Sequence, residues 1–355
     1  MDYFGKVFES HAHHSLEKPL SEAVKTFQEQ FEIHQVEKVA FLSLPHHANE
    51  NATACTFDCM QNLKMLYLKH VFSPNAYAFA HLEHTRMHLD DKELANDYLK
   101  QAEMYCSVGF DGMKMLEGYP SMRKAMGRSL CDSVYDKYYS FLEENGIPVV
   151  LHLANPEVFW DISAAPKEAI ALGRVCDSTY PTKAQLHEEV DGIMKKHPKL
   201  CLTLAHFGFM SYNIEQAKRF LDEYEYTALD TTPGDEQFLE MLKSWDEWQE
   251  FFVQYQDRII YGSDFYPFTN RRPTFLRTFF ETEGDFEFLQ KSFRGVRMEQ
   301  SILDKIYREN MERRVGQPKK IDLEYMRSTA IALKDAPQKH SAFTDEDIDW
   351  ILKTL

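Results

Sequence analysis

Short apolar segments of strand length alternate with amphipathic stretches along most of this 355-residue chain. The apolar segments lie at residues 6–10, 36–44, 76–82, 109–116, 147–153, 200–206, 226–229 and 258–264. Apolar residues recurring every three to four positions predict helices at 20–34, 60–69, 91–107, 132–145, 182–197, 214–224, 245–255 and 299–313. Alternating strands and helices are typical of a parallel sheet, and a closed barrel of eight such units needs about 250 residues. The pattern predicts an α/β fold, a (β/α)8 TIM barrel.

The chain changes character after Gly316, where charged residues become frequent. We expect the barrel to occupy residues 1–316 and a C-terminal helical extension to occupy residues 317–355. The extension carries none of the candidate chemistry, and it offers a surface for a dimer contact, so the oligomeric state stays open.

Composition narrows the classes of partner. The formal net charge is -16, which repels phosphate backbones and argues against nucleic acid. There is no run of about 18 apolar residues, and the N-terminus lacks the basic and apolar regions of a signal peptide. The cysteines are too sparse for a disulfide framework, namely Cys55, Cys59, Cys106, Cys131, Cys176 and Cys201. We expect a cytoplasmic protein that acts on a small molecule, with no membrane partner.

Ionisable residues stand at or near the C-terminal ends of the predicted strands, where barrels of this kind build their sites. They are His11 and His13 on strand one, Lys114 on strand four, His152 on strand five, His206 on strand six and Asp264 on strand eight. Since side chains alternate along a strand, His11 and His13 project to the same side. His14 takes their place if the register differs by one residue. His46, His47, His81 and His84 also lie near strand ends, where we expect pocket or loop roles.

Three imidazole nitrogens and one carboxylate oxygen form a donor set that suits a divalent metal. Zinc is favoured, with manganese, iron or cobalt as alternatives. Each residue alone is weak evidence, because a single His206 is more often a core histidine and a single Asp264 more often caps a helix. The histidines and Asp264 occur together on four predicted strands, one, five, six and eight, and this supports the hypothesis of a metal site.

Five segments, in this order, resemble the amidohydrolase superfamily, within it the group that contains the aminocarboxymuconate-semialdehyde and resorcylate decarboxylases. The segments are Ser10–His13, Gly109–Lys114, Pro148–His152, Thr203–Gly208 and Ile260–Asp264, and a closing helix carries Ile306, Asn310 and Arg313. The similarity spans roughly residues 6–316.

The resemblance implies a metal site made of His11, His13, His152 and Asp264. Asp264 would also act as general base toward a metal-bound water, and His206 would polarise the substrate or protonate the product. Lys114 stands where dinuclear members carry a carboxylated lysine that bridges two metals. The alternative, which we favour, is a mononuclear site in which an unmodified Lys114 binds a substrate carboxylate or pairs with Glu117.

Loops after the strands supply candidates for substrate binding. Phe159 and Trp160 either wall a pocket for a flat substrate or fasten their long loop to the barrel, and we favour the second. Arg271 and Arg272 follow Asp264 and suit a substrate carboxylate, or else balance an acidic surface. The segment 230–232 offers a further polar contact.

These features favour a hydrolase that uses a metal-activated water on an amide, ester or lactone. A non-oxidative decarboxylase of an aromatic or enamine carboxylate is the first alternative, because the same site can orient a carboxylated substrate. A barrel that binds a ligand without catalysis is the second.

Overall fold

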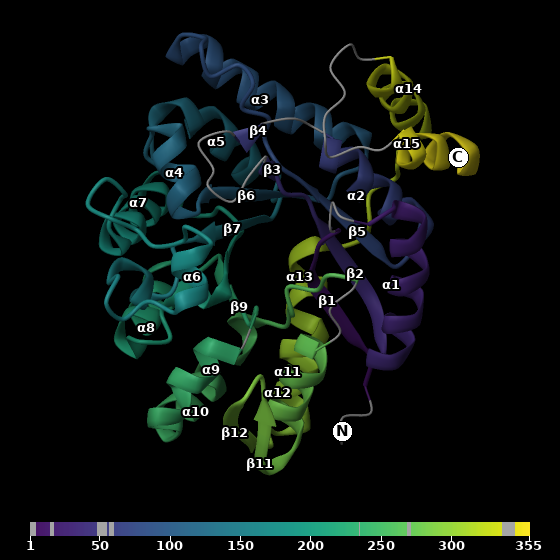
Figure 1. Cartoon of the computed structure of the whole chain (residues 1–355). Coiled ribbons are helices and arrows are strands. Elements are labelled where there is room, and N and C mark those ends of the chain that lie inside the picture. The colour runs from purple at the N-terminus through teal and green to yellow at the C-terminus, as the bar shows by residue number, and fades with distance from the viewer. Residues whose placement is uncertain are drawn as a thin grey trace.

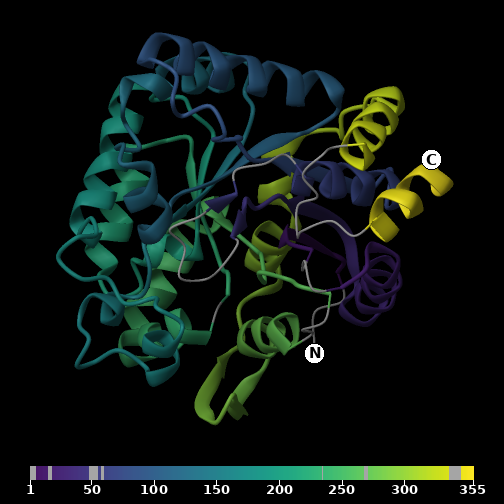
Figure 2. The ribbon, with the colours of Figure 1, turned by 45° about the horizontal axis from the view of Figure 1, so that its top comes forward.

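The computed structural model describes residues 5–14, 18–47, 55–56, 60–233, 235–267, 271–335 and 345–355, and these build a barrel of eight parallel strands surrounded by helices (Figures 1 and 2). Each strand pairs in parallel with the next barrel strand along the chain. The first strand meets the segment that follows the last strand through a parallel bridge between Ala12 and Phe265. The predicted (β/α)8 barrel is confirmed.

The barrel strands are β1 (Val7–Ala12), β2 (Val36–Leu42), β5 (Ala76–Ala80), β6 (Gly112–Gly118), β7 (Val149–Leu153), β8 (Leu202–Ala205), β9 (Thr227–Asp230) and β10 (Ile259–Ile260). Two antiparallel pairs lie outside the barrel, β3 (His46–His47) with β4 (Cys55–Thr56) and β11 (Glu283–Phe288) with β12 (Lys291–Val296).

The helices around the first half of the barrel are α1 (Leu20–His34), α2 (Met60–Val71), α3 (Asp91–Val108), α4 (Pro120–Met126), α5 (Asp136–Glu144), α6 (Lys167–Ala171) and α7 (Lys183–Lys196). Those that follow are α8 (Ile214–Glu223), α9 (Asp235–Met241), α10 (Trp245–Gln254), α11 (Arg271–Glu281), α12 (Gln300–Asp304), α13 (Asn310–Val315), α14 (Leu323–Lys334) and α15 (Asp345–Thr354). None of the helices among the described residues is both long and apolar enough to cross a membrane.

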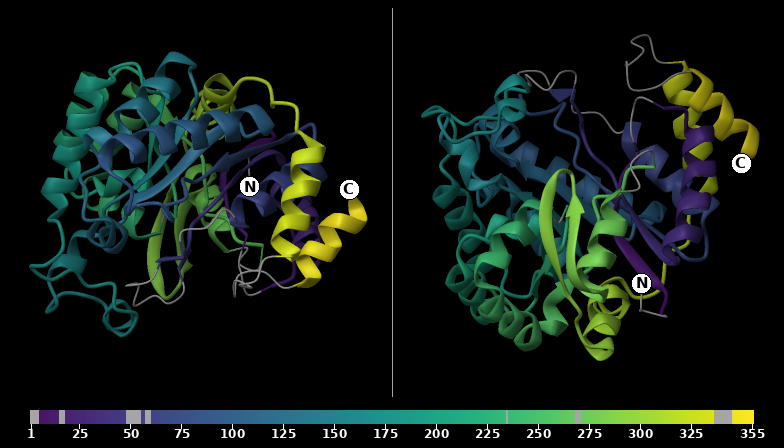
Figure 3. Two further views of the ribbon diagram at one scale, coloured as in Figure 1. Left: turned by 90° about the horizontal axis from the view of Figure 1, so that it is seen from above. Right: turned by 60° about the horizontal axis from the view of Figure 1, so that its bottom comes forward.

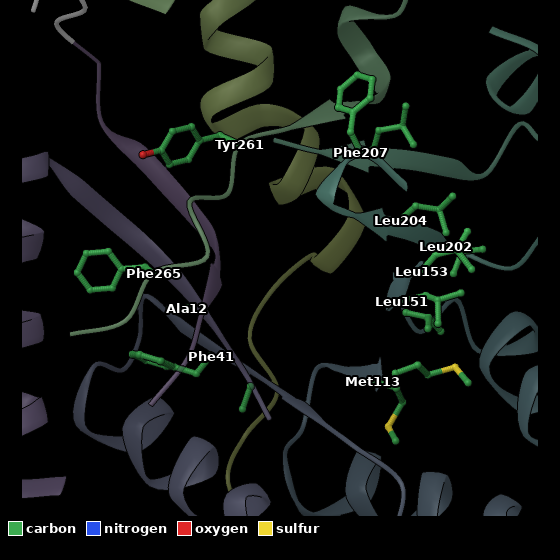
Figure 4. Close-up of a cluster of buried hydrophobic side chains, with 14 of the residues drawn as sticks. Ala12, Phe41, Met113, Leu151, Leu153, Leu202, Leu204, Phe207, Tyr261 and Phe265 are labelled. Atoms are coloured by element: carbon green, nitrogen blue, oxygen red, sulfur yellow. The ribbon is translucent and has the colours of Figure 1, made fainter. Parts of the chain in front are cut away.

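Alternate residues of each strand pack on opposite faces of the barrel wall. On β2, Ala40 and Leu42 fill the barrel interior, whereas Val39 and Phe41 pack outward against the helices. Figure 4 shows the same outward packing for the leucines of β7 and β8, which cluster on one side of these two strands. Because both faces are buried, the strands read as continuous apolar runs in the sequence.

Two predicted strands begin or end elsewhere than the apolar pattern suggests. Strand four begins at Gly112, because Gly109 ends α3 with a φ of 116° and lies against Ile321, whose Cα would be 2.8 Å from an added Cβ. Strand eight is only Ile259–Ile260, so the predicted residues up to Asp264 form a loop above it. Apolar residues indicate that a segment is buried, and the segments before Gly112 and after Ile260 are buried loops.

The hairpin of β11 and β12 was not predicted. Its turn residues, Leu289 and Gln290, have φ values of 48° and 61°. Two-residue hairpin turns of this conformation favour Asn and Gly, so the sequence lacks the usual turn signal. The hairpin packs on α11 through a cluster of phenylalanines, and it projects from the barrel in Figure 1.

The chain beyond Gly316 contains α14 and α15, in accordance with the predicted helical extension, while the domain division at residue 316 stays a prediction. The incoming segment is held by a buried ion pair, in which Lys69 Nζ lies 2.7 Å from Asp111 and 2.9 Å from the carbonyl oxygen of Lys319. Asp111 also accepts a hydrogen bond from the backbone N–H of Lys319 at 2.8 Å. Figure 3 shows α14 and α15 beside α1 and α2.

A second buried ion pair fastens α15. Asp347 lies 2.6 Å from Nζ of Lys64 on α2 and accepts the backbone N–H of Leu20, at the start of α1, at 2.7 Å. Both side chains are almost fully buried, and burial lowers the pKa of Lys64. The pair therefore joins three helices at a point without access to water.

We expect Asp347→Asn to lower the free energy of unfolding by about 3 kcal/mol, because it removes the carboxylate that pairs with the buried Lys64 ammonium. The matched control is Asp349→Asn on the same helix, whose partner Lys334 and own side chain are about half exposed. That change should cost less than about 1 kcal/mol. Urea unfolding measures both, and equal effects would contradict a special role for the buried pair.

Candidate metal centre

The candidate residues gather at the C-terminal ends of the barrel strands. His11 is the penultimate residue of β1 and His13 directly follows the strand. His152 lies in β7, His206 follows β8 and Asp264 follows β10. The backbone there is unusual for residues other than glycine, since positive φ values occur at Ala154, His206, Phe207, Phe209 and Asp264. Such conformations cost of order 1–3 kcal/mol each and tend to cluster at functional sites.

His11, His13 and Asp264 form one cluster, in which one ligand atom of each residue lies within 4.8 Å of the others. The two imidazole rings are 4.9 Å apart between centroids. Nε2 of His13 lies 3.5 Å from a carboxylate oxygen of Asp264. The predicted convergence of the His-x-His pair is therefore present, with Ala12 between them packed outward.

The opposite nitrogen of each ring is fixed by a hydrogen bond. Nδ1 of His11 lies 2.8 Å from Oδ2 of Asp230, and Nδ1 of His13 lies 2.7 Å from the carbonyl oxygen of Leu42. Since both partners are acceptors, each Nδ1 carries the proton. A neutral ring then has its free electron pair on Nε2, which is the form that binds a metal.

The buried environment keeps these rings neutral. Burial lowers the pKa of His13 to about 4, although Asp264 acts in the opposite direction. Burial and the nearby Lys114 lower the pKa of His11 well below its ordinary value. At neutral pH neither ring needs to lose a proton before it can donate to a cation.

Asp264 is ionised and paired with an arginine. Its Oδ2 accepts a hydrogen bond from Nη1 of Arg272 at 2.5 Å, and its carbonyl oxygen accepts another at 3.1 Å. Burial by itself raises the pKa of Asp264, but the Arg272 guanidinium, with His13, His11 and Lys114, outweighs burial and holds the pKa below its usual value. A carboxylate is thus available beside the two imidazoles.

Lys114 reaches the cluster from β6, with Nζ 3.3 Å from Nε2 of His11. Burial lowers its pKa to about 8, although the carboxylates of Asp230, Asp264 and Glu117 oppose the change. Glu117 itself binds Nε2 of His84 at 2.8 Å. Lys114 is therefore a buried amine within reach of the cluster, and a fraction of it is neutral near pH 8.

His152 and His206 form a pair beside the cluster. Nδ1 of His152 lies 2.8 Å from Nε2 of His206, and Nε2 of His152 lies 3.1 Å from the carbonyl oxygen of Ala154. His206 also contacts His11, with 5.5 Å between ring centroids. The structure thus brings His152 next to the other predicted ligands but not into the group of three, and its role as a ligand stays a prediction.

The other predicted candidates lie farther out. Trp160 donates its indole N–H to the carbonyl oxygen of Pro181 at 3.1 Å, which fastens the loop after β7. Arg271 is exposed and lines a groove of about 530 Å³ between α11 and the hairpin.

The remaining histidine candidates also lie outside the cluster. His14 is buried outside the cluster, and the side chains of His46 and His47 lie outside the described residues. His81 and His84 bind Ser43 and Glu117 respectively.

Two buried acids support the cluster, and the sequence drew little attention to them. Glu9 accepts hydrogen bonds from the backbone N–H groups of His11 and Ser263 and from the Ser263 hydroxyl. Asp230 accepts one from His11, as described, and lies at the end of β9. The position of Asp230 at a strand end was a usable signal, whereas Glu9 stands at a register shift in β1 that the alternating pattern does not reveal.

This donor set fits a divalent cation. Two imidazoles with free Nε2 electron pairs and one ionised carboxylate are ligands that zinc and related metals take. The acceptors Asp230 and the Leu42 carbonyl oxygen supply the supporting hydrogen bonds that such ligands usually have.

Comparisons with known proteins identify one family and one fold. The amidohydrolase family model matches residues 98–313. No curated protein sequence matches the chain. Among solved structures, an uncharacterised TIM-barrel protein from Bordetella bronchiseptica is 11% identical, with a TM-score of 0.57 over 88% of this chain and 100% of that one.

Two further solved structures have the same fold. A 2,6-dihydroxybenzoate decarboxylase from Rhizobium is 13% identical, with a TM-score of 0.52 over 88% of this chain and 99% of that one. A 4-oxalomesaconate hydratase from Rhodopseudomonas palustris is 12% identical, with a TM-score of 0.52 over 92% of this chain and 98% of that one. At these identities the similarity concerns the fold.

The buried Glu9 generates a prediction about pH. Burial, only partly offset by Ser263, raises its pKa from 4.5 to about 8, so the folded protein retains a proton that the unfolded chain releases. Its contribution to the free energy of unfolding should fall as pH rises from about 5 to about 8, by at most about 1.4 kcal/mol per pH unit. Glu9→Gln should remove this decline and be more stable than wild type near pH 8.

Urea unfolding of chelator-treated protein at several pH values measures the difference between wild type and variant. Glu22→Gln on the exposed face of α1 is the control and should follow the wild-type curve. A constant difference between wild type and Glu9→Gln across the range would show that Glu9 is ionised in the folded protein throughout.

Proposed function

The chain belongs to the amidohydrolase family, and on that premise we propose that it is a metal-dependent hydrolase that cleaves an amide, ester or lactone bond with water. The observation that carries the proposal is the cluster of His11, His13 and Asp264 at the C-terminal end of the barrel. We propose these three, together with His152, as the metal ligands, with zinc as the favoured ion.

A bound divalent ion lowers the pKa of water and polarises a substrate carbonyl group. Asp264 then accepts the proton of the attacking water, because its carboxylate is ionised and lies in the cluster. His206 lies beside His11 and His152 and is placed to hydrogen-bond the substrate or to deliver a proton to the leaving group. Arg272, whose guanidinium is already at Asp264, binds a carboxylate of the substrate.

A carboxylated Lys114 would allow the site to hold a second metal. Its amine lies 3.3 Å from the His11 ring, and its lowered pKa favours the neutral form that carboxylation requires. We favour the mononuclear site, because Lys114 is also held by attraction to three carboxylates.

A decarboxylase is the second candidate function. Arg272 favours it, since a guanidinium next to the cluster can orient a carboxylate that leaves as carbon dioxide. The two reactions differ in water consumption. Incorporation of labelled oxygen from water into the product supports hydrolysis, whereas release of carbon dioxide without such incorporation supports decarboxylation.

We expect the double change His11→Ala, His13→Ala to remove bound metal and to reduce turnover by more than the ~10- to 100-fold that loss of an outer partner costs. Metal content by mass spectrometry and turnover on a panel of amides, esters and lactones are the readouts. His187→Ala is the control, since His187 is buried on α7 and outside the cluster. Full activity of the double variant would refute the metal-dependent mechanism.

Arg271 and Arg272 allow a direct test of carboxylate recognition. Arg272→Met should lower kcat/KM roughly 10- to 100-fold for substrates that carry a carboxylate, because a charge-assisted hydrogen bond is lost. Arg271→Met is the matched control and should change little, since Arg271 lies in the outer groove. An equal loss on substrates with and without the carboxylate would indicate that Arg272 serves Asp264 alone.

A further inference from the structure

Four consecutive residues after β8, from His206 to Phe209, form a turn of left-handed backbone. Their φ values are 58°, 56°, 57° and 51°, and Gly208 is the single glycine among them. The ψ values of Phe207 and Gly208 are 21° and 19°, so the turn is close to the mirror image of a 3-10 helix. Left-handed backbone is ordinarily limited to single residues, because each side chain adds a steric cost. The surroundings must therefore hold the turn in place.

The turn sends its side chains to two sides. With about three residues per turn, residues i and i+3 lie on the same side, so Phe209 lies against His206. Their ring centroids are 5.4 Å apart, and the Phe209 ring lies 6.0 Å from that of His152. Phe207 packs outward on α10, with its ring 5.8 Å from that of Trp248. A right-handed turn would direct these side chains elsewhere, so the position of the His206 imidazole depends on this turn.

The side-chain amide of Gln237 on α9 fastens the first residue of the turn. Its Nε2 lies 2.7 Å from the carbonyl oxygen of His206 and 2.8 Å from the carbonyl oxygen of Thr232. An amide nitrogen carries two hydrogens, so it donates to both carbonyl oxygens at once. Because Gln237 is buried, bulk water does not compete for these groups. The two hydrogen bonds therefore tie the segment after β8 to the segment after β9.

The backbone N–H of His206 is bound from the same side. It donates to Oδ1 of Asp230 at 2.7 Å and lies 3.2 Å from Oγ1 of Thr232. Asp230 also binds the His11 ring. Thr232 also binds the His206 ring. By contrast, the hydrogen bonds of the Gln237 amide nitrogen both go to backbone oxygens, so a change at Gln237 alters the turn and leaves these imidazole contacts their partners.

We propose that Gln237 is a positioning residue for His206. By holding the carbonyl oxygen of His206 it maintains the left-handed turn, and the turn directs the His206 imidazole and the Phe209 ring toward His11 and His152. The role in the turn stands apart from the reaction. Its consequence for turnover rests on the proposed function, in which His206 hydrogen-bonds the substrate or delivers a proton.

The first measurement concerns the turn alone. Since the Phe209 ring lies 5.4 Å from the His206 ring, its ring current shifts the carbon-bound proton signals of His206 in spectra of the full-length protein. Gln237→Met has a similar shape without the two donors and should move these signals, which His206→Asn assigns. Gln237→Asn keeps an amide but is one carbon shorter, so we expect a smaller shift. Unchanged His206 signals in Gln237→Met would overturn the proposal.

A double-mutant cycle on turnover tests whether Gln237 acts through His206. Gln237→Met alone should lower kcat roughly 10- to 100-fold on the panel of amides, esters and lactones, because a small displacement of an aligned group costs this much. Added to His206→Asn, the same change should cost less than about 2-fold, since the group that it positions is already absent. Equal losses in both backgrounds would overturn the proposal, because Gln237 would then act independently of His206.

Gln101→Met is the matched control. Gln101 on α3 is also buried, and its amide nitrogen donates to the carbonyl oxygen of Glu83 and to Oδ2 of Asp97. This change should lower the free energy of unfolding about as much as Gln237→Met, yet leave the His206 signals and kcat unchanged. A comparable loss of kcat in Gln101→Met would show that turnover follows stability, and would overturn the proposal.

The two measurements also separate this proposal from the proposed function. If the wild-type protein turns over none of the panel while Gln237→Met moves the His206 signals, the role of Gln237 in the turn is supported and the proposed hydrolase function fails. If the wild-type protein is active and Gln237→Met changes neither the signals nor kcat, the proposed function is retained and the role of Gln237 fails.

Discussion

The closure of the barrel between β1 and the segment after β10 is the contact on which the site depends. The backbone N–H of Phe265 donates to the carbonyl oxygen of His11, and the N–H of His13 donates to the carbonyl oxygen of Phe265, each at 2.8 Å. These two hydrogen bonds join parts of the chain about 250 residues apart and place Asp264 beside both histidines. Gly262 allows the close approach, because a Cβ there would lie 2.9 Å from His11, Ser10 and Thr232.

Burial then determines the chemical state of the groups that the closure brings together. The imidazoles are neutral because desolvation penalises their charged form, whereas Asp264 remains ionised because Arg272 compensates for its burial. The site therefore combines neutral nitrogen donors with one anionic oxygen donor at neutral pH. The hydrogen bonds from Asp230 and Leu42 fix which nitrogen of each ring is free, so orientation and protonation are set by the same contacts.

The C-terminal helices hold the N-terminal part of the chain in place from outside the barrel. Asp347 joins Lys64 on α2 and the first turn of α1, and α1 begins shortly after the His11-x-His13 pair. The Lys69–Asp111 pair holds the preceding segment against the wall. Loss of one partner of a buried ion pair is costly, because the other charge stays buried, so both pairs disfavour other placements of this segment.

The sequence by itself determined the barrel and the candidates for its site. Apolar runs that alternate with amphipathic helices specify parallel strands, and ionisable residues after those runs must lie at one end of a parallel barrel. It also determined the family, through segments whose order and content resemble it. These features could be predicted because they are local in the chain or follow from the direction of the strands.

Only the tertiary structure decided how the site is assembled. Arg272 could not be told from Arg271 by sequence, and the structure separates them because one turns toward Asp264 and the other toward an outer groove. The role of Glu9 depends on a register shift in β1 and on hydrogen bonds from Ser263, which no local pattern encodes. Which nitrogen of His11 and of His13 carries the proton is settled by acceptors on other strands, because a ring nitrogen that faces an acceptor carries the proton.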